Sequence, residues 1–204
     1  MKNPDTFDRA EPGPRKANKR HVLRVALAQF DKDGIDATTI EGIRDLAETS
    51  IGSMYHHFGS KDGLLAALYF IALDDQLALI EPQIVSASDP RGAIAGLIGS
   101  YLEWVVQQPK LARFMFQARS YVAAGPHKDA LAERNQRRYG TLLKRLREGV
   151  KDGVIRQMPS ELYASLLVGQ SENYCRAWLS SRVQGKPTDY TSIFVEAAWR
   201  SISK

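Results

Sequence analysis

Apolar side chains recur at intervals of three and four residues along almost the whole chain, and no segment alternates apolar and polar residues with a period of two. Such spacing places an apolar stripe on one side of a helix, and a following glycine commonly ends that helix. The clearest stripe precedes Gly34 and comprises Val22, Leu23, Ala26, Leu27 and Phe30. The pattern predicts an all-α protein of about nine helices without a sheet.

Capping residues divide this pattern into separate helices. Thr38 or Thr39 is a natural N-cap for a short second helix, and Ser60 for a long fourth one. Asp89-Pro90 combines a capping acid with proline at the first helical position. We therefore expect helices over about 18–33, 39–46, 51–57, 60–80, 127–150, 159–183 and 189–203, with two more beginning at residues 90 and 109.

Composition limits the classes of protein that fit. The 204 residues are 44% hydrophobic, which is enough to bury a core, and no uncharged apolar stretch reaches the roughly 18 residues that span a bilayer. Met1 to Asn18 are polar and lack the apolar segment of a secretory signal. Cys175 is the only cysteine, which excludes an internal disulfide and a cysteine zinc cage. We expect a reduced, cytoplasmic setting, no membrane association and no cofactor.

Net charge alone does not identify a partner. The chain carries +5 at neutral pH with a pI near 9.3, as many ordinary proteins do. A basic run without acids is followed directly by a stretch that is rich in acids. The basic run consists of Arg15, Lys16, Lys19, Arg20 and Arg24. Nucleic-acid binding has to be argued from geometry rather than from total charge.

Three short helices joined by a tight turn, within residues 19–65, predict a helix-turn-helix whose second member enters the major groove of DNA. A glycine early in that helix, Gly52, allows close backbone approach, and short hydroxyls beside it can donate to phosphates or base edges. The supporting helix begins at residues where its dipole favours a phosphate. These considerations select Thr38, Thr39, Ser50, Gly52, Ser53, Tyr55 and Lys61 as DNA-contact candidates.

This segment resembles the DNA-binding module of the tetracycline-repressor-like family. The resemblance runs through Phe30-x-x-x-Gly34-Ile35-x-x-Thr38-Thr39-Ile40-x-x-Ile43 and Ser50-x-Gly52-Ser53-Met54-Tyr55-His56-His57-Phe58-x-Ser60-Lys61-x-x-Leu64-Leu65, about a quarter of the chain. It implies base or phosphate contacts by Ile51, Gly52, Ser53, Tyr55 and His56, a base contact by Glu41, and backbone contacts by Thr39, Tyr55 and Lys61.

The chain departs from the family pattern at three positions. Glu48 stands in the turn where glycine is usual, so the turn is either less tight or holds a strained φ. Arg44 replaces a small residue and is a further candidate for a phosphate contact. Ile51, at the tip of the reading helix, favours contact with a thymine methyl group rather than a hydrogen bond.

The resemblance also implies a ligand-responsive repressor. We expect a flexible basic arm at 1–16, a DNA-binding domain at 17–62 and a ligand-binding and dimerisation domain at 63–204. Apolar side chains on two faces of residues 160–203 agree with a homodimer built through the last two long helices. An aromatic or amphipathic effector is expected among Tyr101, Trp104, Arg113, Phe114, Gln117, Asn173, Tyr174 and Trp178.

Several features have two interpretations. Adjacent His56 and His57 point in different directions on a helix, so a metal site is disfavoured. Cys175 is either a redox sensor or an inert buried thiol, and the basic stretch 134–151 either binds nucleic acid or is a solvated helix face. The arm either reaches the minor groove or is a disordered tail. A helical enzyme with an appended DNA-binding-like module is the alternative function, although no catalytic motif is found.

Overall fold

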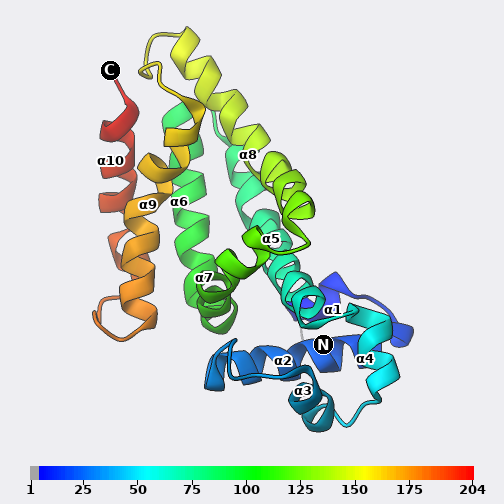
Figure 1. Ribbon diagram of the computed structural model, residues 1–204. Helices are drawn as coiled ribbons and strands as arrows, with labels where there is room; N and C mark the ends of the chain where they lie inside the picture. Colours follow the sequence, from blue (N-terminus) through cyan, green and yellow to red (C-terminus); the bar gives the residue numbers. More distant parts are fainter. Residues whose placement is uncertain (1–4) are drawn as a thin grey trace. The chain divides into compact units, whose positions relative to one another are not determined.

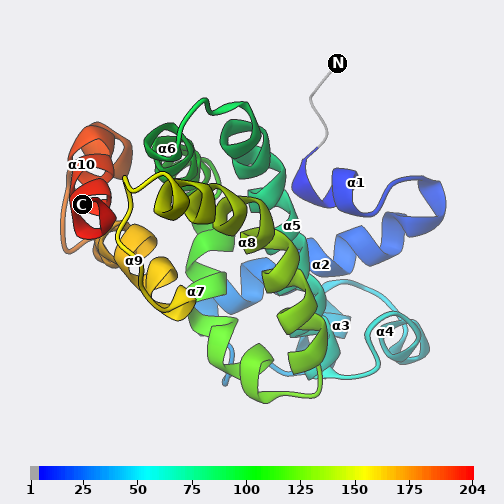
Figure 2. The same cartoon turned by 90° about the horizontal axis from the view of Figure 1, so that it is seen from above.

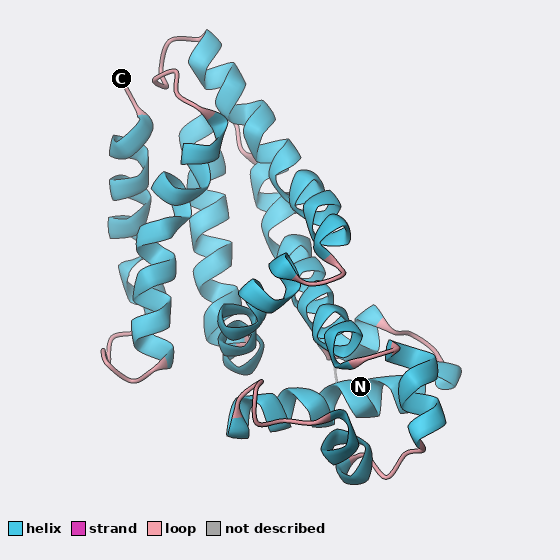
Figure 3. Cartoon of the chain, in the orientation of Figure 1, coloured by secondary structure: helices cyan, strands magenta, loops and turns pink. Residues whose placement is uncertain are grey.

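Helices account for nearly all of the regular structure in the computed structural model, which describes residues 5–204. Ten α-helices and two short 3₁₀ helices occur within this range, and the only extended pairing in it is an isolated bridge between Ile155 and Ser203 (Figure 3). The all-α prediction is confirmed. The described chain divides into two units, one comprising residues up to 75 with 110–133 and the other 76–109 with 134–204.

The first unit contains the expected three-helix module. Its elements are α1 (Thr6–Ala10), η1 (Pro14–Lys16), α2 (Ala17–Asp33), α3 (Ile40–Leu46), α4 (Ile51–Phe58), the first half of α5 (Lys61–Ser86), α7 (Pro109–Ala124) and the start of α8 (Lys128–Lys151) (Figure 1). Fully buried Phe30, Ile43, Met54 and Leu64, one from each of α2 to α5, supply its core. Gly34 ends α2 with a φ of 82°, as its sequence position predicted.

The segment before residue 17 differs from its prediction. Pro4, Pro12, Gly13 and Pro14 were expected to prevent any helix, and Pro4 lies outside the described residues. Between these breakers α1 still forms, because the Asp5 side chain accepts a hydrogen bond of 2.8 Å from the backbone N–H of Asp8. Phe7 is buried, and the Arg24 guanidinium lies 5.6 Å from its ring centroid. The expectation of a helix-free arm is therefore wrong for residues 6–10.

The second unit is built from the second half of α5, α6 (Pro90–Gln107), most of α8, α9 (Ser160–Leu179), η2 (Pro187–Tyr190) and α10 (Thr191–Ile202). Helices α6, α9 and α10 pack against one another, as the two views in Figures 1 and 2 show. Asp89 caps α6 by accepting a 2.7 Å hydrogen bond from the N–H of Gly92, which confirms the predicted helix start. Arg145 on α8 donates to the carbonyls of Val85 and Ala87, and so satisfies the end of α5.

Helix α5 is apolar over most of its 26 residues. Among the helices of the described chain, α5 alone is long and apolar enough to cross a membrane. This holds when up to two charged residues are allowed in its apolar stretch. Half of its apolar window is buried inside the protein, and core helices of globular proteins have the same length and composition. Its composition therefore does not by itself indicate a membrane span.

Candidate DNA-binding surface and effector site

One face of α4 is open to solvent while the opposite face holds the helix in the module. Met54 and Phe58, four residues apart, are buried. Ile51 and Tyr55, also four residues apart, are 39% and 51% exposed, and Gly52 and His56 beside them are exposed as well. The predicted reading helix therefore presents together the residues that the sequence selected for base contacts.

Side-chain hydroxyls cap the helices that bracket this face. Ser50 Oγ accepts a hydrogen bond of 3.1 Å from the backbone N–H of Ser53, and Thr39 Oγ1 accepts one of 3.1 Å from the N–H of Gly42. Ser60 caps α5 in the same way, at 3.1 Å from the N–H of Gly63. Because each hydroxyl uses a lone pair in its cap, its proton remains available to a phosphate or another acceptor.

Thr38 does not belong to this surface. Its side chain is only 3% exposed, and its hydroxyl donates to the carbonyl of Gly34 at 2.7 Å. It closes the loop between α2 and α3, whereas Thr39, which is exposed, caps α3. Since its donor is used inside the protein, we remove Thr38 from the set of DNA-contact candidates.

The turn before α4 is strained. Glu48 has a φ of 47°, in the left-handed region that glycine adopts without cost. The sequence predicted either a less tight turn or a strained φ at Glu48, and the structure has the strained φ. The turn closes through hydrogen bonds from the N–H of Glu48 to the carbonyl of Asp45 and from that of Thr49 to Arg44, both 3.2 Å.

Three other predicted contact residues have contrasting environments. Arg44 forms an ion pair with its neighbour Asp45, with Nε 2.7 Å from Oδ1, which reduces the net positive charge that it offers to a phosphate. Glu41, in the first turn of α3, is exposed. Lys61 begins α5 directly after the Ser60 cap and is half-buried.

The basic run on α2 is largely neutralised by acids from α1 and the residues that flank it. Asp8 Oδ1 lies 2.9 Å from both Arg20 and Arg24, and Asp5 also pairs with Arg24. The sequence missed this pairing because the acids lie in the segment that was expected to be an unstructured arm. The run therefore offers less free positive charge than the sequence indicated.

Glu11 binds the two lysines at the beginning of α2, Lys16 at 3.4 Å and Lys19 in a shorter contact. Burial acts to raise the pKa of Glu11, but the hydrogen bond and charge of Lys19, aided by Lys16, outweigh it and lower the pKa. On α4, burial lowers the pKa of His57, with further lowering from His56 and Lys19. The beginning of α2 is therefore electrostatically coupled to the reading helix.

The predicted effector residues divide between the two units. Arg113, Phe114 and Gln117 belong to the first unit, together with the DNA-binding module. Arg113 makes a bidentate ion pair with Asp31 (2.7 and 3.2 Å), and the Phe114 ring stacks on Phe30 at 5.6 Å. Gln117 is exposed. Because these two side chains hold α7 against α2, we no longer regard Arg113 and Phe114 as effector ligands, whereas Gln117 stays a prediction.

The other five predicted residues lie in the second unit. Tyr101 and Trp104 on α6 are buried, at 5% and 2% exposure, while Asn173 on α9 is exposed. Tyr174 donates to the carbonyl of Gly185 at 3.0 Å, and its ring packs against those of Tyr190 and Phe194. Trp178, one turn beyond Tyr174, is half-buried.

The Tyr101 hydroxyl is buried without a hydrogen-bond partner. Burial raises the pKa of Tyr101 well above its ordinary value, and Cys175 and Glu172 raise it further. Burial likewise raises the pKa of the Cys175 thiol to about 12, which identifies it as a protonated, inert group. On neighbouring elements of this unit, the Arg138 guanidinium donates to the buried amide oxygen of Gln76. Gln76 was not singled out from the sequence, and Arg138 was noted only as part of the basic stretch 134–151, because nothing in their spacing marks them as a pair.

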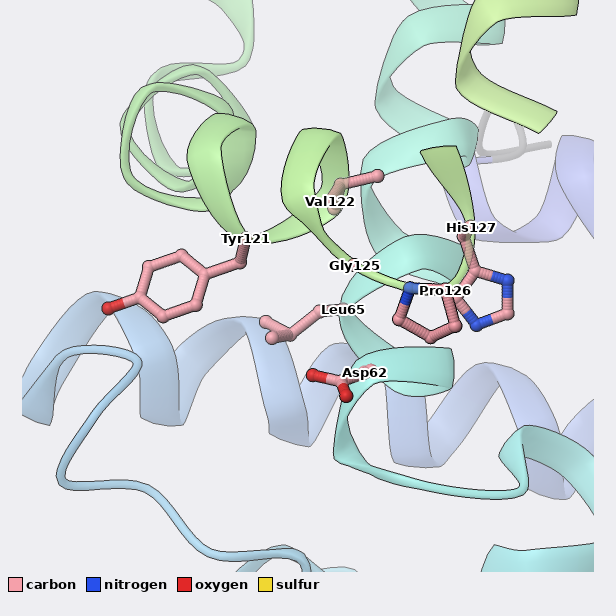
Figure 4. A pocket seen from close by; sticks show the side chains of 7 residues that line it. All are labelled: Asp62, Leu65, Tyr121, Val122, Gly125, Pro126 and His127. Atoms are coloured by element: carbon pink, nitrogen blue, oxygen red, sulfur yellow. The ribbon is translucent and has the colours of Figure 1, made fainter. Parts of the chain in front are cut away.

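A small pocket in the first unit is lined by α5, α7 and the turn that follows α7. Figure 4 shows Asp62 and Leu65 of α5 on one side and Pro126 and His127 of the turn on the other. The space amounts to about 170 Å³, but side chains leave no room in it for a water molecule. Tyr121 at its edge donates to Asp36 at 2.7 Å. This pocket is a packing feature and is too small for an effector.

Comparison with known proteins agrees with this geometry. The family model described as bacterial regulatory proteins of the tetR family matches residues 22–68, which run from α2 into α5. The chain is 26% identical over 144 residues to the transcriptional repressor KstR2 of Mycobacterium tuberculosis, an alignment that covers 71% of this chain and 72% of that protein. Residues 22–68 therefore form a DNA-binding module of the TetR family, and the rest of the chain is similar to regulators of that family.

Solved structures extend the likeness of this chain over both of its units. A TetR-family regulator from Marinobacter aquaeolei VT8 has a TM-score of 0.76 at 18% identity, covering 93% of this chain and 97% of that one. The ketosteroid transcriptional regulator KstR2 of Mycobacterium tuberculosis has a TM-score of 0.64 at 22% identity, covering 95% and 99%. At these identities the structures show the fold of a TetR-family protein. The relatives named here are transcriptional regulators.

Proposed function

We propose that this chain is a TetR-family regulator that represses transcription by binding a pseudo-palindromic operator as a homodimer, and that it leaves the operator when a small molecule binds. The observation that carries the proposal is the open face of α4, where Ile51 and Tyr55 are exposed between the capped starts of α4 and α5. Such a helix fits the major groove with its N-terminal turns toward the bases. Because transcription is controlled where the DNA lies, the regulator acts in the cytoplasm.

The proposed contacts follow from exposure and donor chemistry. Ile51 contacts a thymine methyl group, while Ser53, His56 and the Gly52 backbone face base edges or adjacent phosphates. Glu41 reaches a base from α3. The proposed phosphate contacts come from exposed or half-buried donors around the reading helix, namely Thr39, Arg44, Ser50, Tyr55 and Lys61.

A homodimer is supported by the surface of α9 and α10 in the single chain. Leu162 on α9 and Ile193 on α10 are 45% and 62% exposed, and Leu166, Phe194 and further apolar side chains around them are half-buried. A Cβ added at Gly169 would meet nothing within 4 Å, so this face leaves room for another helix. Exposed apolar side chains on two adjacent helices are typical of a subunit interface. Light scattering at micromolar concentration should give the mass of two chains, and a monomer would contradict the proposal.

For the effector we propose the second unit, around Tyr101 and Trp104 of α6, with α9 contributing Asn173, Tyr174 and Trp178. An unpartnered buried hydroxyl beside aromatic side chains suits an apolar or aromatic molecule that carries one hydrogen-bonding group. The relative KstR2 is described as a ketosteroid regulator, and a ketosteroid is a ligand of that amphipathic kind. Helix α5, which runs through both units, is the proposed lever between effector and operator.

The enzyme alternative receives no support from the comparisons, since the relatives named above are transcriptional regulators. Among the described residues, no group of three or more His, Cys, Asp or Glu side chains is arranged to hold a metal ion. We therefore propose a regulatory role without catalysis. A gel-shift experiment with the DNA upstream of the coding region and of its neighbouring genes discriminates between the two functions.

The DNA-binding proposal is tested by variants of two kinds. Lys61→Ala and Tyr55→Phe remove proposed phosphate contacts, so they should weaken binding to all sequences, and Lys61→Ala should reduce the salt slope by about one. Changes at Ile51 or Ser53 should instead alter base preference. A Lys61→Ala protein with a new sequence preference and an unchanged salt slope would contradict these assignments.

A further inference from the structure

Asn18 joins three parts of the module through its side-chain amide. It lies in the first turn of α2, and its Nδ2 is 3.1 Å from Thr49 Oγ1 in the turn and 2.8 Å from Ser53 Oγ on α4. Asn18 is exposed, whereas both hydroxyl residues are half-buried. The sequence analysis did not single out Asn18, because it precedes the resemblance and lies about 30 residues from the groups that it binds.

This arrangement fixes which way the Ser53 hydroxyl can act. An amide nitrogen has two hydrogens, and Asn18 gives one to each hydroxyl. Ser53 Oγ therefore accepts from the protein, and its single proton is left for an outside partner. The backbone N–H of Ser53 is also used, because it donates to Ser50 Oγ at 3.1 Å. What Ser53 offers to DNA is thus its hydroxyl proton together with one remaining lone pair.

We propose that Asn18 is a specificity-determining positioning residue, which leaves the Ser53 proton free and so lets Ser53 donate to an acceptor at the edge of an operator base. This inference rests on the proposed DNA-binding function. In the major groove guanine presents O6 and N7, thymine O4 and adenine N7, whereas cytosine presents only an N4 donor. Wild-type protein can therefore bind guanine or thymine through Ser53, which a protein without this free proton cannot do.

Asn18→Asp reverses the polarity with little change in shape. A carboxylate only accepts, so Thr49 and Ser53 must donate to it, and Ser53 then offers lone pairs to the DNA. Such an acceptor favours the amino groups of cytosine N4 and adenine N6. The aspartate also suits its place in the first turn of a helix, where an acid is favourable.

The experiment is selection from a library of DNA duplexes with randomised half-sites, followed by sequencing, with full-length wild-type and variant proteins. At one position of each half-site, wild type should favour guanine or thymine over cytosine about tenfold more than Asn18→Asp does, the value of one hydrogen bond. Asn18→Asp should shift that position toward cytosine or adenine. Ser53→Ala should remove the preference in both the wild-type and the Asn18→Asp background, since the effect passes through Ser53.

Ala17→Asp is the matched control for charge. Ala17 is exposed, adjacent to Asn18 and without a polar group, so the variant adds the same negative charge next to the same turn of α2. It should lower affinity for every sequence and leave base preference unchanged. Circular dichroism and thermal unfolding of all variants verify the fold.

Three results would overturn the proposal. One is that Asn18→Asp selects the same bases as wild type, another that Ser53→Ala keeps the wild-type preference, and the third that Ala17→Asp reproduces the shift of Asn18→Asp. Failure of the underlying function has a different signature, because wild-type protein would then enrich no sequence from the library.

Discussion

The strained turn before the reading helix allows a prediction whose size follows from one angle. At a φ of 47° an L-residue pays about 1–2 kcal/mol that glycine does not pay. Glycine also gives the unfolded chain greater conformational freedom, which lowers the free energy of unfolding by about 0.4–1 kcal/mol and offsets part of this gain. Glu48→Gly should therefore raise the free energy of unfolding by about 0.5–1 kcal/mol, or the melting temperature by about 1–4 °C.

Glu48→Gln is the matched control, since it removes the same charge while keeping a side chain at the positive φ. Glu48 is exposed, and within residues 5–204 its side chain makes no hydrogen bond or ion pair, so neither substitution breaks such a contact there. The two variants should differ in urea unfolding followed by circular dichroism. Any gain in DNA affinity that arises from the lost acid should appear in both.

Two outcomes would refute this reasoning about strain. Equal or lower stability of Glu48→Gly relative to wild type would mean that the left-handed turn costs nothing here. An equal gain in Glu48→Gln would assign the stabilisation to the removal of negative charge rather than to relief of the backbone. In either case the glutamate would be an ordinary turn residue.

Three further predictions concern buried and paired groups. Tyr101→Phe removes a buried hydroxyl without a partner, so the free energy of unfolding should rise by about 1 kcal/mol in a thermal unfolding assay, whereas a decrease would reveal a hydrogen bond. Glu11→Gln releases Lys16 and Lys19, so it should tighten DNA binding about two- to fivefold at 0.1 M salt and make the salt dependence of binding steeper. Asp8→Asn is the control and should not tighten binding, because its partners Arg20 and Arg24 lie a turn further along α2. Cys175, with a pKa of about 12, stays protonated at pH 8, so Ellman's reagent should react with it only after unfolding in urea; rapid reaction of the native protein would contradict its burial.

Local signals in the sequence predicted the module well. A terminal glycine and apolar spacing determine α2, and capping hydroxyls begin the next three helices, with Thr39 at α3, Ser50 at α4 and Ser60 at α5. Glu48 was recognised through the family resemblance, because glycine is usual at this position of the turn, and its φ is indeed positive. These features depend on interactions between residues three or four apart, which a sequence displays directly.

Long-range pairing was much less predictable. Phe7 and the acids of α1 contact α2 across intervening breakers, so the composition of residues 1–16 gave no indication that they would fold onto it. Asn18 binds residues 31 and 35 positions away, and Arg138 binds Gln76 across 62. Nothing in the spacing of these residues indicates such contacts, because they depend on tertiary structure.

Three of the predicted effector residues lie on α7, and the contacts of this helix bear on the proposed route from effector to operator. Helix α7 follows α6 directly, so its aromatic side chains were expected to line the same site. Instead α7 is fastened to the DNA-binding module at three places: Phe114 on Phe30, Arg113 on Asp31 and Tyr121 on Asp36. The chain passes between the two units within α5, at the start of α7 and within α8. In the switch proposed above, α7 is therefore a second candidate, beside α5, for the helix that links the effector site to the module.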